Sequence, residues 1–191
     1  MRSTGRAPGY GVTVFGRRKP PRSLRPKLDA GERWLAWARS ADHPGQAVVA
    51  TTLGLYLPGR PRLGWHQIHK AVWSGSRLTI IPSVPVGDPV PLDGAGSYAV
   101  LADDEPVTLT LTEPGDVPAE VRTRVTRSVA YTAHHPVPGG GVRVVARRVP
   151  GVNGLAWHVR YDDGTPHDDP AVVAATTQLV AEAVAARRTP D

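Results

Sequence analysis

His66 and His69 form an H-x-x-H pair, a spacing that can place two imidazole ligands on one metal ion. In a strand the two rings would point to opposite faces, whereas in a single helical turn they could converge. A third ligand is missing, because the sequence has no cysteine and no carboxylate lies close to the pair. We therefore expect exposed or partly buried histidines, with neither a metal site nor a cofactor.

Four carboxylates gather in residues 162–169, which read DDGTPHDD. Their spacing departs from that of a calcium-binding loop, and the distal glutamate of such a loop is missing. A turn followed by the N-cap of a helix accounts for the same residues. This segment therefore predicts a helix start, capped by Asp168 or Asp169, in place of a metal site.

Local catalytic motifs are missing from the sequence. It contains no G-x-S-x-G elbow, no P-loop and no glycine-rich nucleotide-binding turn between a strand and a helix. A Ser/His/Asp triad stays open, because its members need not be close in sequence. An enzyme would have to assemble its site from distant residues, and the first places to look are His66, His69, Arg122 and Asp163. We predict that the protein is not an enzyme.

The net charge of +6 comes from the N-terminus. Residues 1–28 hold eight of the 23 basic residues and none of the 17 acidic ones, so the remaining chain has a net charge of −2. Gly, Pro and Arg dominate this segment, which predicts a disordered basic tail. The alternative is an arm that contacts nucleic acid or an anionic lipid surface. The candidate anionic-partner contacts are Arg17, Arg18, Lys19, Arg22, Arg25 and Lys27.

Three features of the sequence bear on localisation. The chain has no cysteine, which fits a reducing cytoplasm. No apolar run approaches the roughly 20 residues that a membrane-spanning helix needs. The N-terminus has no apolar stretch behind its charges, so we expect no signal peptide. Together these features predict a cytoplasmic protein without a membrane span.

Four short apolar runs, separated by turn residues, lie within residues 31–81. Runs this short and this close cannot be joined by crossover helices, so the pattern predicts an antiparallel meander. In the second run one face carries Leu53, Leu55 and Leu57, together with Val49 and Thr51. We expect the three leucines to mark the core.

Four tryptophans, Trp34, Trp37, Trp65 and Trp73, lie in this meander. Trp34 and Trp37 are three residues apart, so in a regular strand they face opposite sides. One of the two is expected to fill the core. The other is either a surface anchor for a partner or is covered by the C-terminal hairpin, which makes both Trp34 and Trp37 candidate aromatic anchors.

The same region resembles the bacterial members of the pleckstrin-homology-like superfamily. The resemblance rests on residues 51–57 (TTLGLYL), the Pro/Gly/Arg turn after them, residues 63–68 (LGWHQI) and Ala71-Val72-Trp73. It implies an α+β fold that is mainly antiparallel, with a partly open barrel of about six to seven strands closed by a helix. The chain also resembles uncharacterised actinobacterial-type proteins of this architecture, which imply no activity.

The family's phosphoinositide site, where present, uses Lys or Arg in the loop between the first two strands. Here that loop is residues 40–45, SADHPG, which has neither. This departure counts against binding of inositol phosphates by the folded body.

A long loop at 82–96 and two strands, at 97–102 and 107–112, follow the meander. A helix is predicted from about Pro118 to His134, because Val117, Val121, Val125 and Val129 recur at i+4 spacing. His134 and His135 are expected to end it.

The C-terminal part predicts a hairpin, in which residues 142–149 pair with 155–161, and a helix from Pro170 to about Arg188. Leu155, Trp157, Val159 and Tyr161 share one face of the second strand, which we expect to be buried. The chain then has three predicted parts: a disordered basic tail (1–28), a pleckstrin-homology-like barrel with its closing helix (29–135), and a hairpin plus helix packed on the barrel (136–191).

A well-patterned sheet without a convergent catalytic set predicts a non-enzymatic binding or scaffold module. A barrel of this kind offers sheet edges and a groove that can take a peptide, so a protein or peptide is the expected partner. The alternatives are association with nucleic acid or an anionic surface through the N-terminal arm, and an enzyme with a dispersed site. The sequence predicts no oligomeric state.

Overall fold

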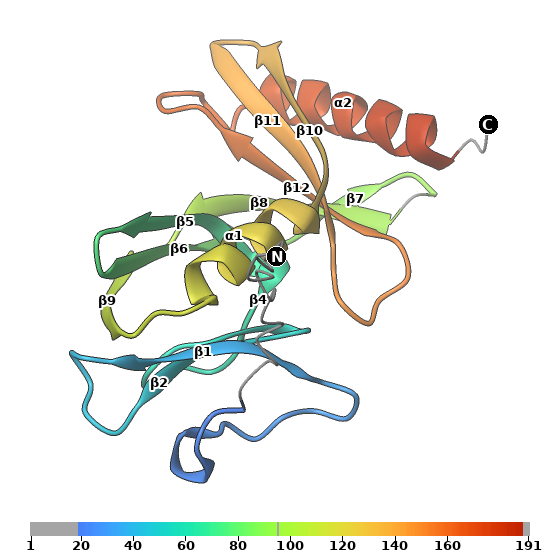
Figure 1. Ribbon diagram of the computed structural model, residues 1–191. Helices are drawn as coiled ribbons and strands as arrows, with labels where there is room; N and C mark the ends of the chain where they lie inside the picture. Colours follow the sequence, from blue (N-terminus) through green and yellow to red (C-terminus); the bar gives the residue numbers. More distant parts are fainter. Residues whose placement is uncertain (1–18, 95, 189–191) are drawn as a thin grey trace, which may run out of the picture.

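The computed structural model describes residues 19–94 and 96–188, and its fold is α+β with mainly antiparallel strands, as predicted (Figure 1). The strands are β1 (Trp34–Ser40), β2 (Ala47–Thr51), β3 (Gly54–Tyr56), β4 (Leu63–Gly64), β5 (Ile68–Ser74), β6 (Arg77–Pro85), β7 (Val90–Leu92), β8 (Gly96–Asp103), β9 (Val107–Thr112), β10 (Val129–Val137), β11 (Gly140–Arg148) and β12 (Leu155–Tyr161). The helices are α1 (Val117–Ser128) and α2 (Pro170–Arg188), with short 3-10 turns at Arg22–Leu24 and Trp65–Gln67.

The strands form one hydrogen-bonded network in the order β10-β11-β12-β8-β6-β9-β1-β2-β3-β4, with β5 on β6 and β7 on β8. Every pair is antiparallel except β12 with β8, which is parallel. The two ends of the order, β10 and β4, do not meet, so the sheet is not closed into a barrel. The barrel of about six to seven strands implied by the resemblance is therefore not confirmed.

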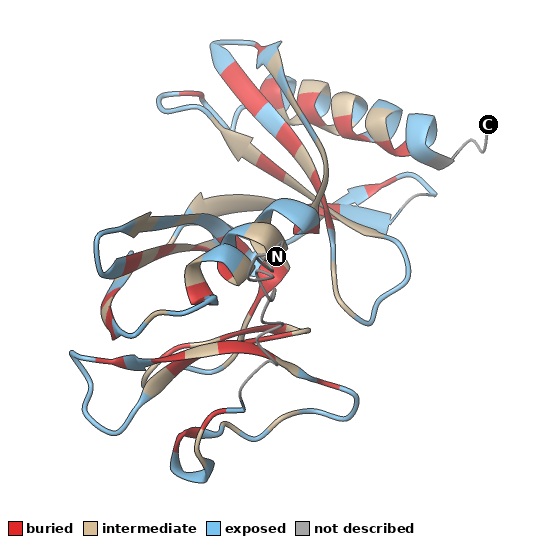
Figure 2. Ribbon diagram, in the orientation of Figure 1, coloured by how far each residue is buried: buried red, intermediate tan, exposed pale blue. Residues whose placement is uncertain are grey.

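Two separate hydrophobic cores hold the sheet in place. The first packs α1 on the strands of the meander and on β9, and contains Trp65, Leu55, Ile80, Val117 and Val121. The second packs α2 along β10, β11 and β12, as Figure 1 shows, and contains Tyr98, Val144, Val159, Val172 and Val180. Buried and more exposed positions alternate along β11 (Figure 2), because one face of that strand contacts α2.

The run from Val49 to Leu57 is not one strand, which corrects the predicted assignment of its faces. β2 ends at Thr51 and β3 begins at Gly54, so the chain reverses between them. Thr51 Oγ1 accepts hydrogen bonds from the backbone N–H groups of Leu53 and Gly54, at 3.3 and 3.1 Å, which fixes this bend. Leu55 and Leu57 are buried as predicted, whereas Leu53, in the bend, is only half-buried.

The predicted helix from Pro118 to His134 is correct as far as Ser128 and wrong beyond it. α1 ends at Ser128, and Val129 begins a nine-residue strand, β10, that pairs with β11. Val117 and Val121 are buried and Val125 packs on the core, so the i+4 spacing is correct within α1. His134 and His135 lie on a strand and do not end a helix, because pairing with β11 outweighs the helical spacing there.

The predictions for the C-terminal hairpin and helix are confirmed. β11 pairs with β12 in antiparallel register, and α2 begins at Pro170. Asp169 Oδ1 accepts a hydrogen bond from Ala171 N–H at 2.7 Å, as expected for a residue at the start of a helix. The predicted buried face of β12 is confirmed in part: Val159 is buried, Trp157 and Tyr161 are half-buried against the second core, and Leu155 is half-buried outside it.

Residues 19–28 of the predicted tail follow a defined path before β1. Leu24 and Pro20 are buried, and Tyr56 donates a hydrogen bond to the carbonyl of Lys27 at 3.2 Å. Residues 1–18 lie outside the described part of the chain, and the three-part division of the chain stays a prediction. Within residues 19–94 and 96–188, neither helix has the length and apolar character that crossing a bilayer requires.

Candidate functional site

Two adjoining hollows form a groove, and Val173 of α2 lines one of them. One has a volume of about 300 Å³ and the other about 390 Å³. Val86, Val100, Tyr161 and His167 line both hollows, so the two are continuous, and we call them together the groove. Five segments of the chain build it: the connection from β6 to β7, the strands β7, β8 and β12 with the loop after it, and α2.

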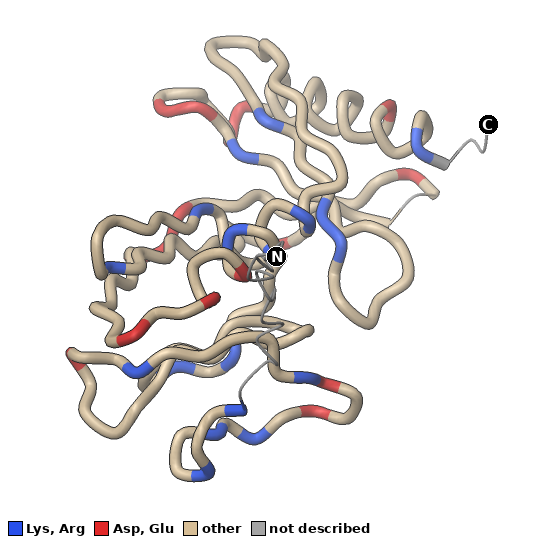
Figure 3. Tube along the Cα trace, viewed as in Figure 1, with Lys and Arg blue, Asp and Glu red and all other residues tan. Residues whose placement is uncertain are grey.

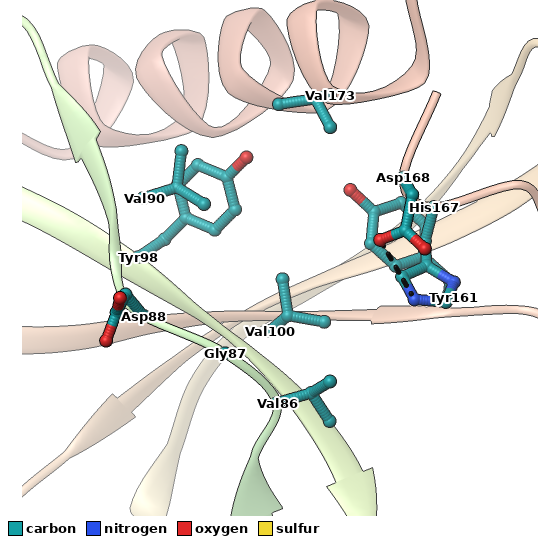
Figure 4. Close-up of a pocket in the computed structure, with 10 residues that line it drawn as sticks. All are labelled: Val86, Gly87, Asp88, Val90, Tyr98, Val100, Tyr161, His167, Asp168 and Val173. Carbon is teal, nitrogen blue, oxygen red and sulfur yellow. Dashed lines mark ion pairs between the residues drawn. The ribbon is translucent and has the colours of Figure 1, made fainter. Parts of the chain in front are cut away.

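The floor of the groove is apolar. Figure 4 shows Tyr98 and Val90 on one side, Tyr161 and His167 on the other, and Val173 of α2 above. Tyr98 and Val100 are two residues apart on β8, so both side chains point to the face that contacts α2.

Both tyrosine rings are held from α2. Tyr98 Oη lies 3.1 Å from Thr177 Oγ1, and Tyr161 donates to Thr176 Oγ1 at 3.1 Å. Burial raises the pKa of Tyr98, so this phenol keeps its proton. The floor is thus fixed by packing and by hydrogen bonds before any partner arrives.

The rim of the groove is acidic. It is lined by Asp88, Asp103, Asp162, Asp163 and Asp168, against one arginine, Arg160. Arg160 Nη1 is already paired with Asp103 at 2.6 Å. Figure 3 marks the acidic residues of the loop between β12 and α2. The rim therefore carries an excess of negative charge that favours a basic partner.

Besides Asp103, which also contacts His69, two of these carboxylates pair with histidines. His134 Nε2 lies 2.7 Å from Asp162 Oδ2, and His167 Nε2 lies 3.4 Å from Asp168 Oδ1 (Figure 4). Within the described residues, Asp88 and Asp163 have no ion-pair partner. These two are the carboxylates most available to a bound cation.

The predicted anchors Trp34 and Trp37 lie outside the groove, on β1. A bulge between Trp34 and Ala36 shifts the register of β1 on β2, so the two tryptophans do not follow the regular alternation that predicted opposite faces. Both are half-buried and neither belongs to the first core. Trp65 fills that core instead, 2% exposed, with its indole N–H donating to the Thr51 carbonyl at 3.0 Å.

The predicted anionic-partner contacts fall in two groups. Arg17 and Arg18 lie outside the described residues. Lys19, Arg22, Arg25 and Lys27 are all exposed, in the basic N-terminal segment that Figure 3 shows before β1. Arg25 is partly fixed, because its Nε donates to the Pro20 carbonyl at 2.7 Å.

The residues named for a dispersed enzyme site do not meet in one place. Asp163 lines the groove, and Arg122 lines a separate hollow between α1 and the β5–β6 hairpin. Neither His66 nor His69 belongs to a group of three or more potential metal ligands in the described part of the chain. His69 Nδ1 instead lies 2.6 Å from Asp103 Oδ1.

Sequence reasoning did not predict the groove, although two of its parts gave a signal. The loop at 82–96 and the acidic segment 162–169 both stand out in the sequence, yet nothing local shows that they face one another. The parallel pairing of β12 with β8 brings them together.

Comparison of the chain with family models, with curated proteins and with solved structures found no match.

Proposed function

We propose that this protein is a non-enzymatic binding module whose groove takes a segment of a partner protein or peptide that carries apolar and basic side chains. The observation that carries this proposal is a fixed apolar floor bordered by carboxylates, two of which lack an ion-pair partner among the described residues. The pleckstrin-homology-like resemblance stays a prediction and is not needed for this function.

The apolar floor supplies most of the expected affinity. Burying one Val- or Leu-sized side chain of the partner contributes about 1.5–3 kcal/mol, and Val86, 43% exposed, would be covered at the same time. Each exposed ion pair at the rim contributes only about 0.2–1 kcal/mol. The carboxylates therefore select basic partners and speed association more than they increase affinity.

Panning a library of random peptides against the full-length chain tests this function. We expect the recovered peptides to combine Lys or Arg with apolar residues and to compete with one another for one site. Recovery of acidic peptides, or of peptides with no shared composition, contradicts the proposal.

A matched pair of variants locates the site. Val86 and Val84 are both exposed valines close together in the chain, but only Val86 lines the groove. Val86→Lys places a cation against the basic partner and is expected to abolish binding, whereas Val84→Lys keeps it. Equal loss or equal retention in the two variants would show that the peptides bind elsewhere.

A second candidate function is association of the basic N-terminal segment with nucleic acid or an anionic surface. The supporting observation is that Lys19, Arg22, Arg25 and Lys27 are exposed within nine residues. Titration of DNA, RNA and anionic vesicles at two salt concentrations tests it. The wild type is compared with two variants: a chain lacking residues 1–18, and a full chain with Arg22→Gln and Lys27→Gln. Equal binding by all three chains would exclude this function.

A further inference from the structure

A second cavity, which we call the cationic cavity, lies on the face of β11 and β12 opposite α2. Val142 and Val144 of β11 are buried in the second core, so Arg143, Val145 and Arg147 face the other way. The cavity has a volume of about 180 Å³. The polar side chains that matter for its chemistry are His69, Thr132, Arg143, Arg147, His158 and Arg160.

Arg147 is a buried cation that has no ion-pair partner among the described residues. It is 7% exposed, and the one hydrogen bond of its side chain within the described residues goes from Nη1 to Ser128 Oγ at 2.9 Å. Burial, and then the charge of Arg160, lowers the pKa of Arg147, which shows how unfavourable its surroundings are for a positive charge. A buried charge of this kind is normally paired with an anion.

His158 is a second unsatisfied group in the same cavity. Both of its ring nitrogens are buried, and neither has a hydrogen-bond partner in the described part of the chain. Burial, followed by the charges of Arg147, His66 and Arg160, lowers the pKa of His158 to about 4. At neutral pH the ring therefore offers one N–H donor and one acceptor to the cavity.

The charges around the cavity leave a positive excess. No carboxylate of the described residues lines it. Arg143 stands directly across from Arg160 in the β11–β12 register, and like charges in that position repel. Arg160 is offset by Asp103 at 2.6 Å, but Arg143 has no ion-pair partner within residues 19–94 and 96–188.

The strand register places these groups around one point. His158 pairs with Val145, and Arg143 and Arg147 lie two residues to either side of Val145 on the same face, about 7 Å away along the strand. Both arginine side chains are long enough to reach one small ligand bound next to His158.

We propose that the cationic cavity binds a single phosphate group, either as inorganic phosphate or as the end of a phosphate ester. The Arg147 guanidinium presents parallel N–H donors to two phosphate oxygens, a geometry that arginine offers and lysine does not. His158 donates to a third oxygen, and Arg143 and Arg160 add charge at the mouth. This site differs in charge from the groove, which favours a cation, although Arg160 borders both.

Titration of the full-length chain with inorganic phosphate, with glycerol 3-phosphate and with acetate, followed by calorimetry, tests the site. We expect saturable binding of at least one phosphate compound with a Kd of about 1 mM or tighter, and weaker binding of acetate. The tighter of the two phosphate compounds identifies whether the ligand is free or esterified. A change in the ring nitrogen NMR signals of His158 on titration is expected in addition.

Three variants decide whether the binding occurs in this cavity. Arg147→Met is expected to weaken phosphate binding at least tenfold. Arg143→Met, which changes an exposed side chain and leaves the fold intact, should weaken it several-fold and carries the test if Arg147→Met does not fold. Arg122→Met, on α1 and outside the cavity, should bind as the wild type does. Wild-type binding by the Arg143 and Arg147 variants, acetate binding as tight as phosphate, or no saturable phosphate binding would overturn the proposal.

Discussion

Arg160 Nη1 donates a hydrogen bond to Asp103 Oδ1 at 2.6 Å, and this ion pair stands between the groove and the cationic cavity. Arg160 lines both the groove and the cationic cavity, whereas Asp103 lines only the groove. Asp103 Oδ1 also lies 2.6 Å from His69 Nδ1, so one carboxylate offsets two groups at the edge of the cavity. The pair therefore limits how strongly Arg160 can act on an anion.

Asp103→Asn should free Arg160 for a ligand. Because this carboxylate is about half exposed, the gain is modest, and we expect phosphate to bind about two- to fivefold more tightly than to the wild type. Calorimetric titration with phosphate measures the change. Asp104→Asn, next along the chain but outside the cavity and the groove, is the control, and equal gains in both variants would show that general charge is responsible.

Glu32→Gln should destabilise the fold strongly. The Glu32 side chain is fully buried and accepts hydrogen bonds from Thr51, from Tyr56 at 3.1 Å and from Arg62 at 2.9 Å. The side-chain NH2 group of glutamine is a donor, so it cannot accept the hydrogen bonds that Glu32 accepts. The Arg62 charge also loses its buried partner, so the free energy of unfolding should fall by about 3 kcal/mol. Denaturation by urea measures it.

Asp29→Asn provides the matched comparison. Asp29 contacts the same guanidinium at 2.6 Å, but its side chain is 64% exposed. An exposed ion pair contributes about 0–1 kcal/mol, so this variant should stay close to the wild type. A loss as large as that of Glu32→Gln would mean that burial does not govern this cluster.

Acidification should destabilise the protein through His158. Its pKa in the fold is about 4, below the ordinary value of 6.5, so between these two values the unfolded chain binds the proton and the folded chain does not. Stability that is fully present above pH 6.5 is therefore lost as pH falls toward 4, by about 3 kcal/mol in all. Burial lowers the pKa of His66 and of His69 as well, and both act in the same direction.

His158→Gln removes this contribution, so its unfolding free energy should fall less steeply between pH 6.5 and 4.5 than that of the wild type. Urea denaturation at a series of pH values gives the two slopes, and His167→Gln, at an exposed histidine, serves as the control. Parallel slopes for the wild type and His158→Gln would contradict the assignment.

Removing the two available carboxylates of the groove should weaken peptide binding. Asp88→Asn with Asp163→Asn deletes up to two exposed ion pairs, each contributing about 0.2–1 kcal/mol, so the Kd of a basic peptide should rise several-fold at low salt. At high salt the variant and the wild type should converge, because screening removes the same attraction. Fluorescence anisotropy with a labelled peptide from the panning follows both. A difference that does not shrink with salt would mean that the substitutions act on structure.

The sequence was most informative where local chemistry decides the structure. The alternation of apolar and polar residues in 142–149 and 155–161 was enough to predict the β11–β12 hairpin. The Asp-Pro pair at 169–170 was enough to predict where α2 begins. The end of α1 could not be predicted in the same way, because Val129 fits both the helical spacing of the valines before it and the strand that pairs with β11.

The two candidate sites escaped prediction for a different reason. His158 pairs with Val145 across the β11–β12 hairpin, and that part was within reach of the sequence. What no local pattern reveals is the parallel contact of β12 with β8, which joins segments about 60 residues apart and assembles the groove. Buried charge also leaves no local signal, since Arg147 and the exposed Arg148 are neighbours in the chain.

The same parallel contact orders events during synthesis on the ribosome. Every buried residue of the first core lies between Leu35 and Val121, so that unit can condense while the C-terminus is still being translated. The second core unites Leu92 with Val184 and must wait for almost the whole chain. Until Trp157 to Val159 emerge, one edge of β8 remains open, and a nascent chain stalled before that point exposes a strand that a holding chaperone would recognise.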